Sequence, residues 1–174
     1  MLSTKQQKEV TDLFTSVFTL SEGEHEGNLI GKLAAKLSSA VDNEEIICFA
    51  TYEQAAIIAA IFFTRLRLER KLQVYLLAPV AVDTEHQGKG IGQALIRYGL
   101  HELKNRSVDI AITYGDPSFY SKVGFEALPE SVIRAPLKLT MPQGWLGQSL
   151  TQEPIPTINE PVACVKEFND PVYW

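Results

Sequence analysis

Cysteine is scarce in this sequence, and long apolar runs and an excess of positive charge are missing from it. The two cysteines, Cys48 and Cys164, stand far apart and lack metal-ligand spacing, which excludes a disulfide framework of the secreted kind. The longest apolar run, residues 55–63, is too short to span a bilayer. The formal net charge of −5 argues against a nucleic-acid binder, because such a protein normally carries a basic field.

The N-terminal residues contain no apolar signal-peptide core, and His86 and His101 lack the spacing of metal ligands. We therefore expect a cytoplasmic protein that binds no metal, no membrane and no nucleic acid. Its 174 residues fit a single domain over residues 1–174, large enough to bury roughly 70% of the surface of the unfolded chain.

Residues 76–95 predict a strand, a glycine-rich turn and a helix in direct succession. The apolar strand ends at Asp83, and an apolar pattern with the helical period follows the turn. Gly88, Gly90 and Gly92 leave three backbone amides uncovered by any Cβ atom. The N-terminus of the helix adds unpaired N–H groups and the positive end of its dipole. Together these features predict a binding site for phosphate or diphosphate.

The spacing of the glycines separates this turn from two common phosphate-binding motifs. A P-loop needs Lys followed by Ser or Thr, whereas Lys89 is followed by Gly90. The dinucleotide fingerprint would begin at Gly88 and require glycine where Gln93 stands. An unrelated nucleotide-phosphate binder stays open as an alternative, and it would prefer ATP or NAD(P).

The rest of the chain predicts helices before and after a group of strands. Amphipathic helices are expected over residues 3–18 and 29–41, joined by a polar loop, residues 21–27, with three carboxylates and one histidine. Strands are expected over residues 46–51, 56–68, 72–82, 108–114, 135–141 and 162–168. Pro79 cannot donate to a ladder and marks a place where pairing is lost. Trp145 is expected to pack in the core in preference to covering a pocket. This order of elements predicts an α+β layer structure.

Asp116 followed by Pro117 predicts the start of a short helix, with an N-cap and then proline at the first helical position. Gly124 ends this helix, and residues 120–125 read Tyr-Ser-Lys-Val-Gly-Phe.

Two motifs together resemble the signatures of the GNAT acyl-CoA N-acetyltransferases. The family's diphosphate loop, [QR]-x-x-G-x-[GA], is matched by Gln87, Gly90 and Gly92, and its Y-x-K-x-G-F segment by residues 120–125. Both motifs occur in the family's order, and together they span roughly residues 74–126. Residues 77–82, which read LAPVAV, and residues 115–120, which read GDPxxY, resemble the bacterial YhbS-like branch of predicted acetyltransferases.

The resemblance implies a GNAT fold, with a mixed, mostly antiparallel sheet flanked by helices and a splayed pair of strands that admits the pantetheine arm of acetyl-CoA. Asp116 stands near the place of an asparagine that contacts the cofactor in the family. The residues that the resemblance assigns to acetyl-CoA are Val80, Ala81, Val82, Gln87, Gly88, Lys89, Gly90, Ile91, Gly92, Gln93 and Asp116.

The implied reaction is N-acetylation of a primary amine by direct attack on the thioester. Tyr120 stands where the family places the general acid, and a phenol with a pKa of about 10 stays protonated at neutral pH. A backbone N–H near Val82 would stabilise the oxyanion. The alternative role for Tyr120 is simple ring packing with Phe119 and Phe125.

The strand segments 76–82 and 110–114 lack the glutamate that serves many GNAT enzymes as base. Asp116, Glu53, the acidic loop or a water chain would have to replace it. The acceptor expected is a small-molecule or peptide amine, cationic if the acidic loop attracts it, and a homodimer is compatible with the sequence. A catalytically silent module that binds or senses acyl-CoA is the alternative function.

Overall fold

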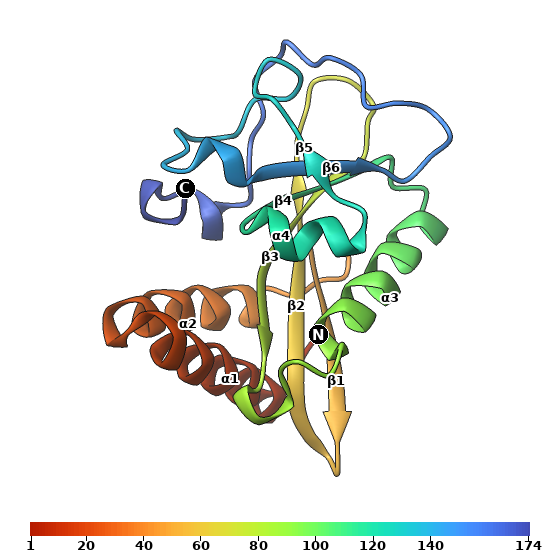
Figure 1. Ribbon diagram of the computed structural model, residues 1–174. Coiled ribbons are helices and arrows are strands. Elements are labelled where there is room, and N and C mark those ends of the chain that lie inside the picture. The colour runs from red at the N-terminus through yellow and green to blue at the C-terminus, as the bar shows by residue number, and fades with distance from the viewer. The chain divides into compact units, whose positions relative to one another are not determined.

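The computed structural model describes residues 1–174 and contains a six-stranded sheet in the order β1-β2-β3-β4-β6-β5 (Figure 1). The strands are β1 (Ile46–Glu53), β2 (Ala56–Leu66), β3 (Val74–Val82), β4 (Ile110–Tyr114), β5 (Glu126–Ala127) and β6 (Trp145–Ser149). The α-helices are α1 (Thr4–Glu22), α2 (Glu24–Ser39), α3 (Ile91–Asn105) and α4 (Pro117–Tyr120). None of the helices is both long enough and apolar enough to cross a membrane.

The residues group into two compact units. The first unit contains residues 1–63 and 79–96, and the second contains residues 64–78 and 97–174. The chain passes between the units within β2, β3 and α3. The prediction of one domain stays a prediction.

Helix α1 of the first unit begins with a complete capping box. The Ser3 hydroxyl accepts a hydrogen bond from the Gln6 amide, and the Gln6 side chain accepts one from the Ser3 amide. The buried face of α1 is Val10, Leu13, Phe14 and Val17, as the sequence predicts. The Phe14 ring packs on Phe62 of β2 with ring centroids 5.8 Å apart, which places this face against the sheet.

The predicted loop over residues 21–27 is wrong. Glu22 ends α1, Glu24 begins α2, and Gly23 alone lies between them. Gly23 has φ +97°, a conformation that glycine adopts at little cost and that reverses the chain in one residue. The carboxylates assigned to an acidic loop therefore lie on helix ends, where Glu24 and Glu26 favour the positive end of the α2 dipole.

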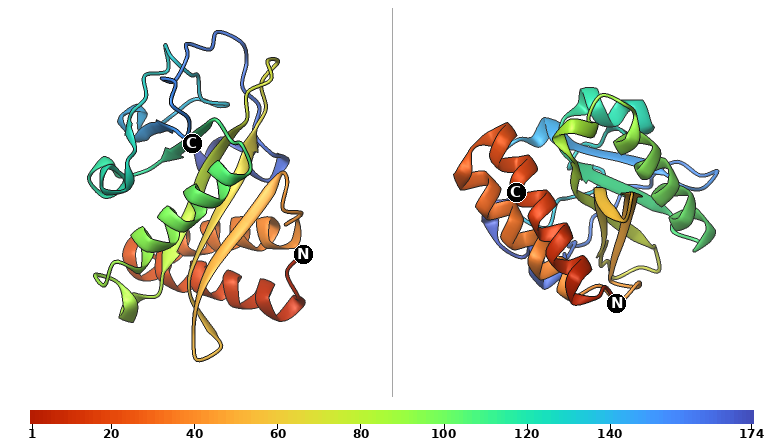
Figure 2. Two further views of the ribbon diagram at one scale, coloured as in Figure 1. Left: turned by 90° about the vertical axis from the view of Figure 1, so that its right-hand side faces the viewer. Right: turned by 90° about the horizontal axis from the view of Figure 1, so that it is seen from below.

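Two glycines on successive turns of α2 bring this helix very close to α1. A Cβ atom at Gly27 would lie 1.9 Å from Oγ1 of Thr19, and one at Gly31 would lie 2.1 Å from Oγ1 of Thr15. Figure 2 shows the two helices packed beside each other. The small residues of α2 thus set the distance between the helices.

Strands β1 and β2 form a hairpin with a two-residue turn at Gln54 and Ala55. Both residues have positive φ, +48° and +69°, which is the conformation of the turn that suits the twist of a hairpin. The middle of β2 is fully buried, and Phe49 of β1 packs edge-on against Phe63 of β2. The predicted strand positions here are confirmed to within a few residues.

In the second unit, β3 pairs with β4 in parallel, from Val74 opposite Ile110 to Leu77 opposite Thr113. The Asp109 carboxylate accepts a hydrogen bond from the Gln73 amide at 2.8 Å and starts this pairing. The other edge of β4 pairs with β6 in antiparallel orientation along its whole length. Strand β3 continues beyond Leu77 to Val82 and includes Pro79.

The segment after residue 127 contains less strand than predicted. Residues 135–141 form no strand, and residues 162–168 contribute one isolated bridge, Arg67 to Ala163, before a 3-10 turn. The many prolines of this segment remove backbone donors, so side chains hold it in place.

Three kinds of side-chain contact replace the missing ladder. Arg70 binds the Glu160 carboxylate through Nε at 2.9 and 3.0 Å and through Nη2 at 2.9 Å. The Trp174 indole donates to the Phe168 carbonyl at 2.8 Å. Trp145 is buried and donates to the Ile133 carbonyl at 3.0 Å, which confirms its prediction as a core residue.

The close contact between α1 and α2 yields a test of packing. We expect Gly31→Ala to lower the free energy of unfolding by about 1–2 kcal/mol, because overpacking costs about 1–3 kcal/mol and the helix propensity of alanine returns up to about 1. Thr15→Ala should recover part of this loss in the double variant. Chemical denaturation gives the free energy of unfolding of wild type, the two single variants and the double variant. Lys32→Ala, a change at an exposed residue of α2, is the control. An additive double variant would show that the two positions do not meet.

Candidate functional site

The glycine turn lies in the first unit, between the end of β3 and the start of α3. The Asp83 amide donates to the Ile58 carbonyl of β2 at 2.8 Å, which fixes the point where the chain leaves the sheet. The Asp83 carboxylate then caps the 3-10 turn η1 (Thr84–His86) by accepting from the Glu85 amide at 3.0 Å. The start of the turn is therefore anchored to the sheet by backbone and side chain together.

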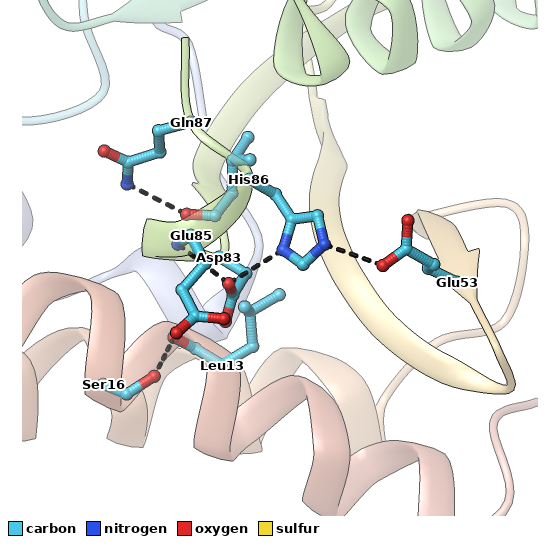
Figure 3. Close-up of polar contacts among 8 residues, drawn as sticks. Leu13, Ser16, Glu53, Asp83, Glu85, His86 and Gln87 are labelled. Carbon is cyan, nitrogen blue, oxygen red and sulfur yellow. Dashed lines mark hydrogen bonds and ion pairs between the residues drawn. The ribbon is translucent and has the colours of Figure 1, made fainter. Parts of the chain in front are cut away.

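Gln87 and Val82, two of the predicted cofactor residues, are in contact. Nε2 of Gln87 donates to the Val82 carbonyl at 3.0 Å, so its side chain folds back over the end of β3 (Figure 3). Ala81 is buried, whereas Val80 and Val82 are partly exposed. Only the partly exposed pair presents side-chain surface at this end of the strand.

Gly88 and Gly90 give the turn an open main chain. Their φ angles are +74° and +77°, and a Cβ atom at either would meet no atom within 4 Å. The amides from Gly88 to Gln93 donate to no group of the protein, and the helix ladder begins with the Ala94 amide, which donates to the Gly90 carbonyl at 3.0 Å. Lys89 is exposed between the two glycines.

These amides converge with the N-terminus of the 15-residue helix α3. Unpaired N–H groups and the positive end of a helix dipole bind anions, and a diphosphate offers several oxygens to such a set. The residues from Gln87 to Gln93 therefore fit the predicted diphosphate site.

His86 sits between two carboxylates at the base of this turn (Figure 3). Its Nδ1 lies 2.9 Å from Oδ1 of Asp83, and its Nε2 lies 2.9 Å from Oε2 of Glu53 at the end of β1. The hydrogen bonds to Asp83 and Glu53 raise the pKa of His86, and the contact with His86 lowers the pKa of Asp83. Sequence reasoning missed this cluster, because Glu53 is 33 residues away from His86 and only the hairpin brings it there.

Asp116 and Tyr120 lie in the second unit, at the two ends of α4. The Asp116 carboxylate caps the helix, with Oδ1 accepting from the Ser118 amide at 2.9 Å and from the Ser118 hydroxyl at 2.8 Å. These hydrogen bonds hold the pKa of Asp116 below its usual value. Gly124 ends the following turn with φ +94°, so the predicted helix start and stop are both confirmed.

The Tyr120 ring is held between two other aromatic rings. Phe119 and Phe125 meet it edge-on, with centroids 5.0 and 5.9 Å away. Gly115 makes room for the ring, since a Cβ atom there would lie 2.7 Å from Cε2 of Tyr120. Burial among these groups, with the nearby Asp116 charge, raises the pKa of Tyr120 to about 12. The phenol is thus a neutral, protonated group near pH 7.

A buried threonine holds the Tyr120 hydroxyl. Thr113 is fully buried on β4, and its Oγ1 donates to the Leu77 carbonyl at 2.8 Å. Tyr120 is hydrogen-bonded to the same hydroxyl. The contact with the Thr113 hydroxyl lowers the pKa of Tyr120, against the larger effect of burial. Sequence reasoning missed Thr113. The signal was a polar threonine inside an otherwise apolar strand, residues 110–114.

Two of the carboxylates suggested as a base have other partners in the structure. Glu53 contacts His86, and Asp116 is bonded to Ser118. Glu22 and Glu24 are exposed on helix ends. None of these contacts assigns a base.

Sequence comparison connects the chain to one family of enzymes. Residues 24–127 match the family model described as the acetyltransferase (GNAT) domain. The chain is 31% identical over 121 residues to the uncharacterized N-acetyltransferase YjhQ of Escherichia coli K12, covering 66% of each chain. It is 33% identical over 78 residues to the uncharacterized N-acetyltransferase YhbS of the same strain, covering 44% of this chain and 47% of YhbS. The chain thus spans from about half to just under two thirds of these relatives.

Structural comparison covers nearly the whole chain. The crystal structure of YhbS from E. coli in complex with CoA matches 97% of this chain and 89% of that one, with a TM-score of 0.78 and 21% identity. A GNAT acetyltransferase of Brucella melitensis in complex with acetyl-CoA matches 97% of this chain and 95% of that one, with a TM-score of 0.72 and 20% identity. These likenesses confirm the predicted fold.

The open glycine turn yields a matched pair of substitutions. We expect Gly90→Ala to weaken the binding of acetyl-CoA, the ligand implied by the motif resemblance, at least about tenfold, because alanine resists the positive φ that aims these amides. Gly23→Ala is the control, since Gly23 has φ +97° and equally open surroundings. Both variants should lose similar stability in thermal unfolding. Equal affinities in calorimetry would show that the turn does not bind the ligand.

Proposed function

Because the chain belongs to the GNAT family of acetyltransferases, we propose that it transfers the acetyl group of acetyl-CoA to a primary amine. The observation that carries this proposal is the set of unpaired amides from Gly88 to Gln93, at open glycines and at the N-terminus of α3. YhbS and the Brucella melitensis protein, which share the fold, were crystallised with CoA and acetyl-CoA. Acetyl-CoA binds as a co-substrate and supplies the acetyl thioester.

The residues of the turn hold the diphosphate of the cofactor by charge and by hydrogen bonds. The amides from Gly88 to Gln93 donate to its oxygens, and exposed Lys89 adds a positive charge. The residues 80–82 at the end of β3 offer backbone groups to the pantetheine arm, with the Val82 carbonyl already bonded to Gln87.

Tyr120 supplies the proton for the departing thiolate of CoA. Its raised pKa keeps it protonated, and its hydroxyl is held by Thr113 before the reaction. Donation of the phenolic proton to the sulfur releases CoA as the free thiol and leaves Tyr120 as the phenolate. The two edge-on rings of Phe119 and Phe125 keep the phenol oriented during this step.

The acceptor is a primary amine on a small molecule or a peptide. No carboxylate lies on β4, and the carboxylates near the proposed site have other partners, so we propose that water removes the proton of the ammonium. The cytoplasmic location and the pairing of two copies stay predictions.

Two measurements separate this proposal from its alternatives. Calorimetric titration with acetyl-CoA, CoA, ATP and NADPH should show binding of the first two only, and a preference for ATP or NADPH would favour the nucleotide binder. Release of free thiol on a panel of amines should show turnover. Tight acetyl-CoA binding with no thiol release on any amine would favour the acyl-CoA-sensing module.

Removal of the phenol tests the assignment of the acid. We expect Tyr120→Phe to lower turnover at least about tenfold while acetyl-CoA affinity stays nearly the same, because general acid catalysis typically contributes about 10²–10⁴ in rate. Tyr52→Phe, a change at an exposed tyrosine of the β1–β2 hairpin, is the matched control. Full turnover in Tyr120→Phe would remove this residue from the mechanism.

The raised pKa of Tyr120 also predicts the alkaline side of the pH profile. An acid with a pKa of about 12 is protonated below that pH, so its contribution is lost only as the pH rises through about 12. Turnover at saturating substrates should therefore rise as the amine loses its proton and then stay level to about pH 10. A decline centred well below pH 10 that disappears in Tyr120→Phe would contradict the assignment.

A further inference from the structure

The contacts of His86 exceed what a neutral imidazole can make. Both ring nitrogens lie 2.9 Å from a carboxylate oxygen, Nδ1 from Asp83 and Nε2 from Glu53. A neutral imidazole has one N–H and one lone pair, whereas ionised carboxylates only accept hydrogen bonds. In the neutral ring, one nitrogen lone pair would face a carboxylate and repel it. The arrangement shown in Figure 3 is therefore that of the imidazolium ion.

The imidazolium joins the tip of the β1–β2 hairpin to the start of the diphosphate turn. Glu53 is the last residue of β1, and its side chain is 59% exposed at the tip of the hairpin. Asp83 is fixed at the start of the turn by the hydrogen bond that its backbone N–H donates to the Ile58 carbonyl. Loss of the ring proton therefore breaks the contact with Glu53 first, because Glu53 is exposed and Asp83 is held by further hydrogen bonds.

The turn that this ring supports is the one that presents the open amides. His86 comes directly before Gln87, two residues before Gly88. A Cβ atom at Gly88 or Gly90 would meet no atom within 4 Å, so no side chain packs over these glycines on that side. The contacts on the preceding residues thus decide how well the amides are aimed before a ligand arrives.

We propose that His86, as the imidazolium bridging Asp83 and Glu53, is a positioning residue that holds the diphosphate turn in its binding conformation and makes acetyl-CoA affinity depend on pH. This inference rests on the proposed function, because it names acetyl-CoA as the ligand of the turn. Glu53 acts through His86 and touches no ligand. The bridge adds no contact to the ligand and lowers the cost of ordering the turn.

The charges around the ring set the direction of the effect. Asp83 and Glu53 are negative and favour the imidazolium, Lys89 is positive and opposes it, and Glu85 lies beside Asp83 on the same turn. On the α1 side, Figure 3 shows uncharged Ser16, whose hydroxyl donates to the Leu13 carbonyl. The folded-state pKa is raised, so the bridge is complete below the ordinary imidazole pKa of about 6.5 and is lost as the pH rises through the higher folded value.

The test compares the acetyl-CoA dissociation constant at about pH 6 and about pH 9 in three proteins. For Glu53→Ala, we expect an affinity about two- to fivefold weaker than wild type at the lower pH and equal to it at the higher pH, as for the loss of one exposed ion pair. Glu85→Ala removes a carboxylate from the same turn without touching the ring. The ratio of its dissociation constants at the two pH values should equal that of wild type. The phosphate of the ligand titrates near pH 6 in all three proteins alike, so it cancels in the comparison.

NMR titration of the His86 ring supplies a readout that a purely structural role would not move. The pKa of His86 should be lower in Glu53→Ala than in wild type and higher in the presence of acetyl-CoA, because linkage is reciprocal. The inference would be overturned if the pKa of His86 were the same with and without acetyl-CoA. It would also be overturned if the dissociation constants at the two pH values had the same ratio in wild type and in Glu53→Ala. Either result would leave acetyl transfer intact. Absence of acetyl-CoA binding by wild type at both pH values would overturn the proposed function itself.

Discussion

The hydrogen bond from Thr113 to the Leu77 carbonyl closes the parallel pairing of β3 with β4, and the proposed chemistry starts from this pairing. After Leu77, β3 runs on to Val82 and the glycine turn, and after Thr113, β4 passes within one residue into the segment that bears Tyr120. The Thr113 hydroxyl is fully buried, so water cannot replace its bond to Leu77. A single hydroxyl thus serves both the register of the strands and the orientation of the proposed acid.

Features that depend on short-range chemistry could be predicted from the sequence. Asp116 before Pro117 satisfies the free amides of a helix start within three residues, and the structure shows this cap. The glycines of the diphosphate turn are likewise a local signal, because Gly88 and Gly90 have positive φ, which glycine adopts at little cost. The two-residue hairpin turn between β1 and β2 lies where the apolar pattern breaks. Each of these elements is specified by neighbours along the chain, which is why pattern and spacing were sufficient.

Features that depend on contacts between distant residues could not be predicted. Glu53 meets His86 only because the β1–β2 hairpin carries it there, and the polarity of a glutamate near a turn says nothing of such a partner. The alternation over residues 135–141 is typical of a strand, yet Pro136 within the segment and Pro142 directly after it leave no run of donors long enough for a ladder. The polar residues 21–27 looked like a loop because they are hydrophilic, whereas one glycine at Gly23 reverses the chain and both flanks stay helical.

The C-terminal segment is attached to its unit at single points: the Arg70–Glu160 ion pair, the Arg67–Ala163 bridge and the Trp174 indole. In a β-ladder, each residue is coupled to the register of its neighbours. Attachment at single points places no such constraint on the number of residues between them. Insertion of residues into such a stretch costs little, since the entropy of loop closure grows only with the logarithm of loop length. Variation in length among related sequences should therefore concentrate between these attachments. The surface formed by the C-terminal segment can then change while the sheet stays the same.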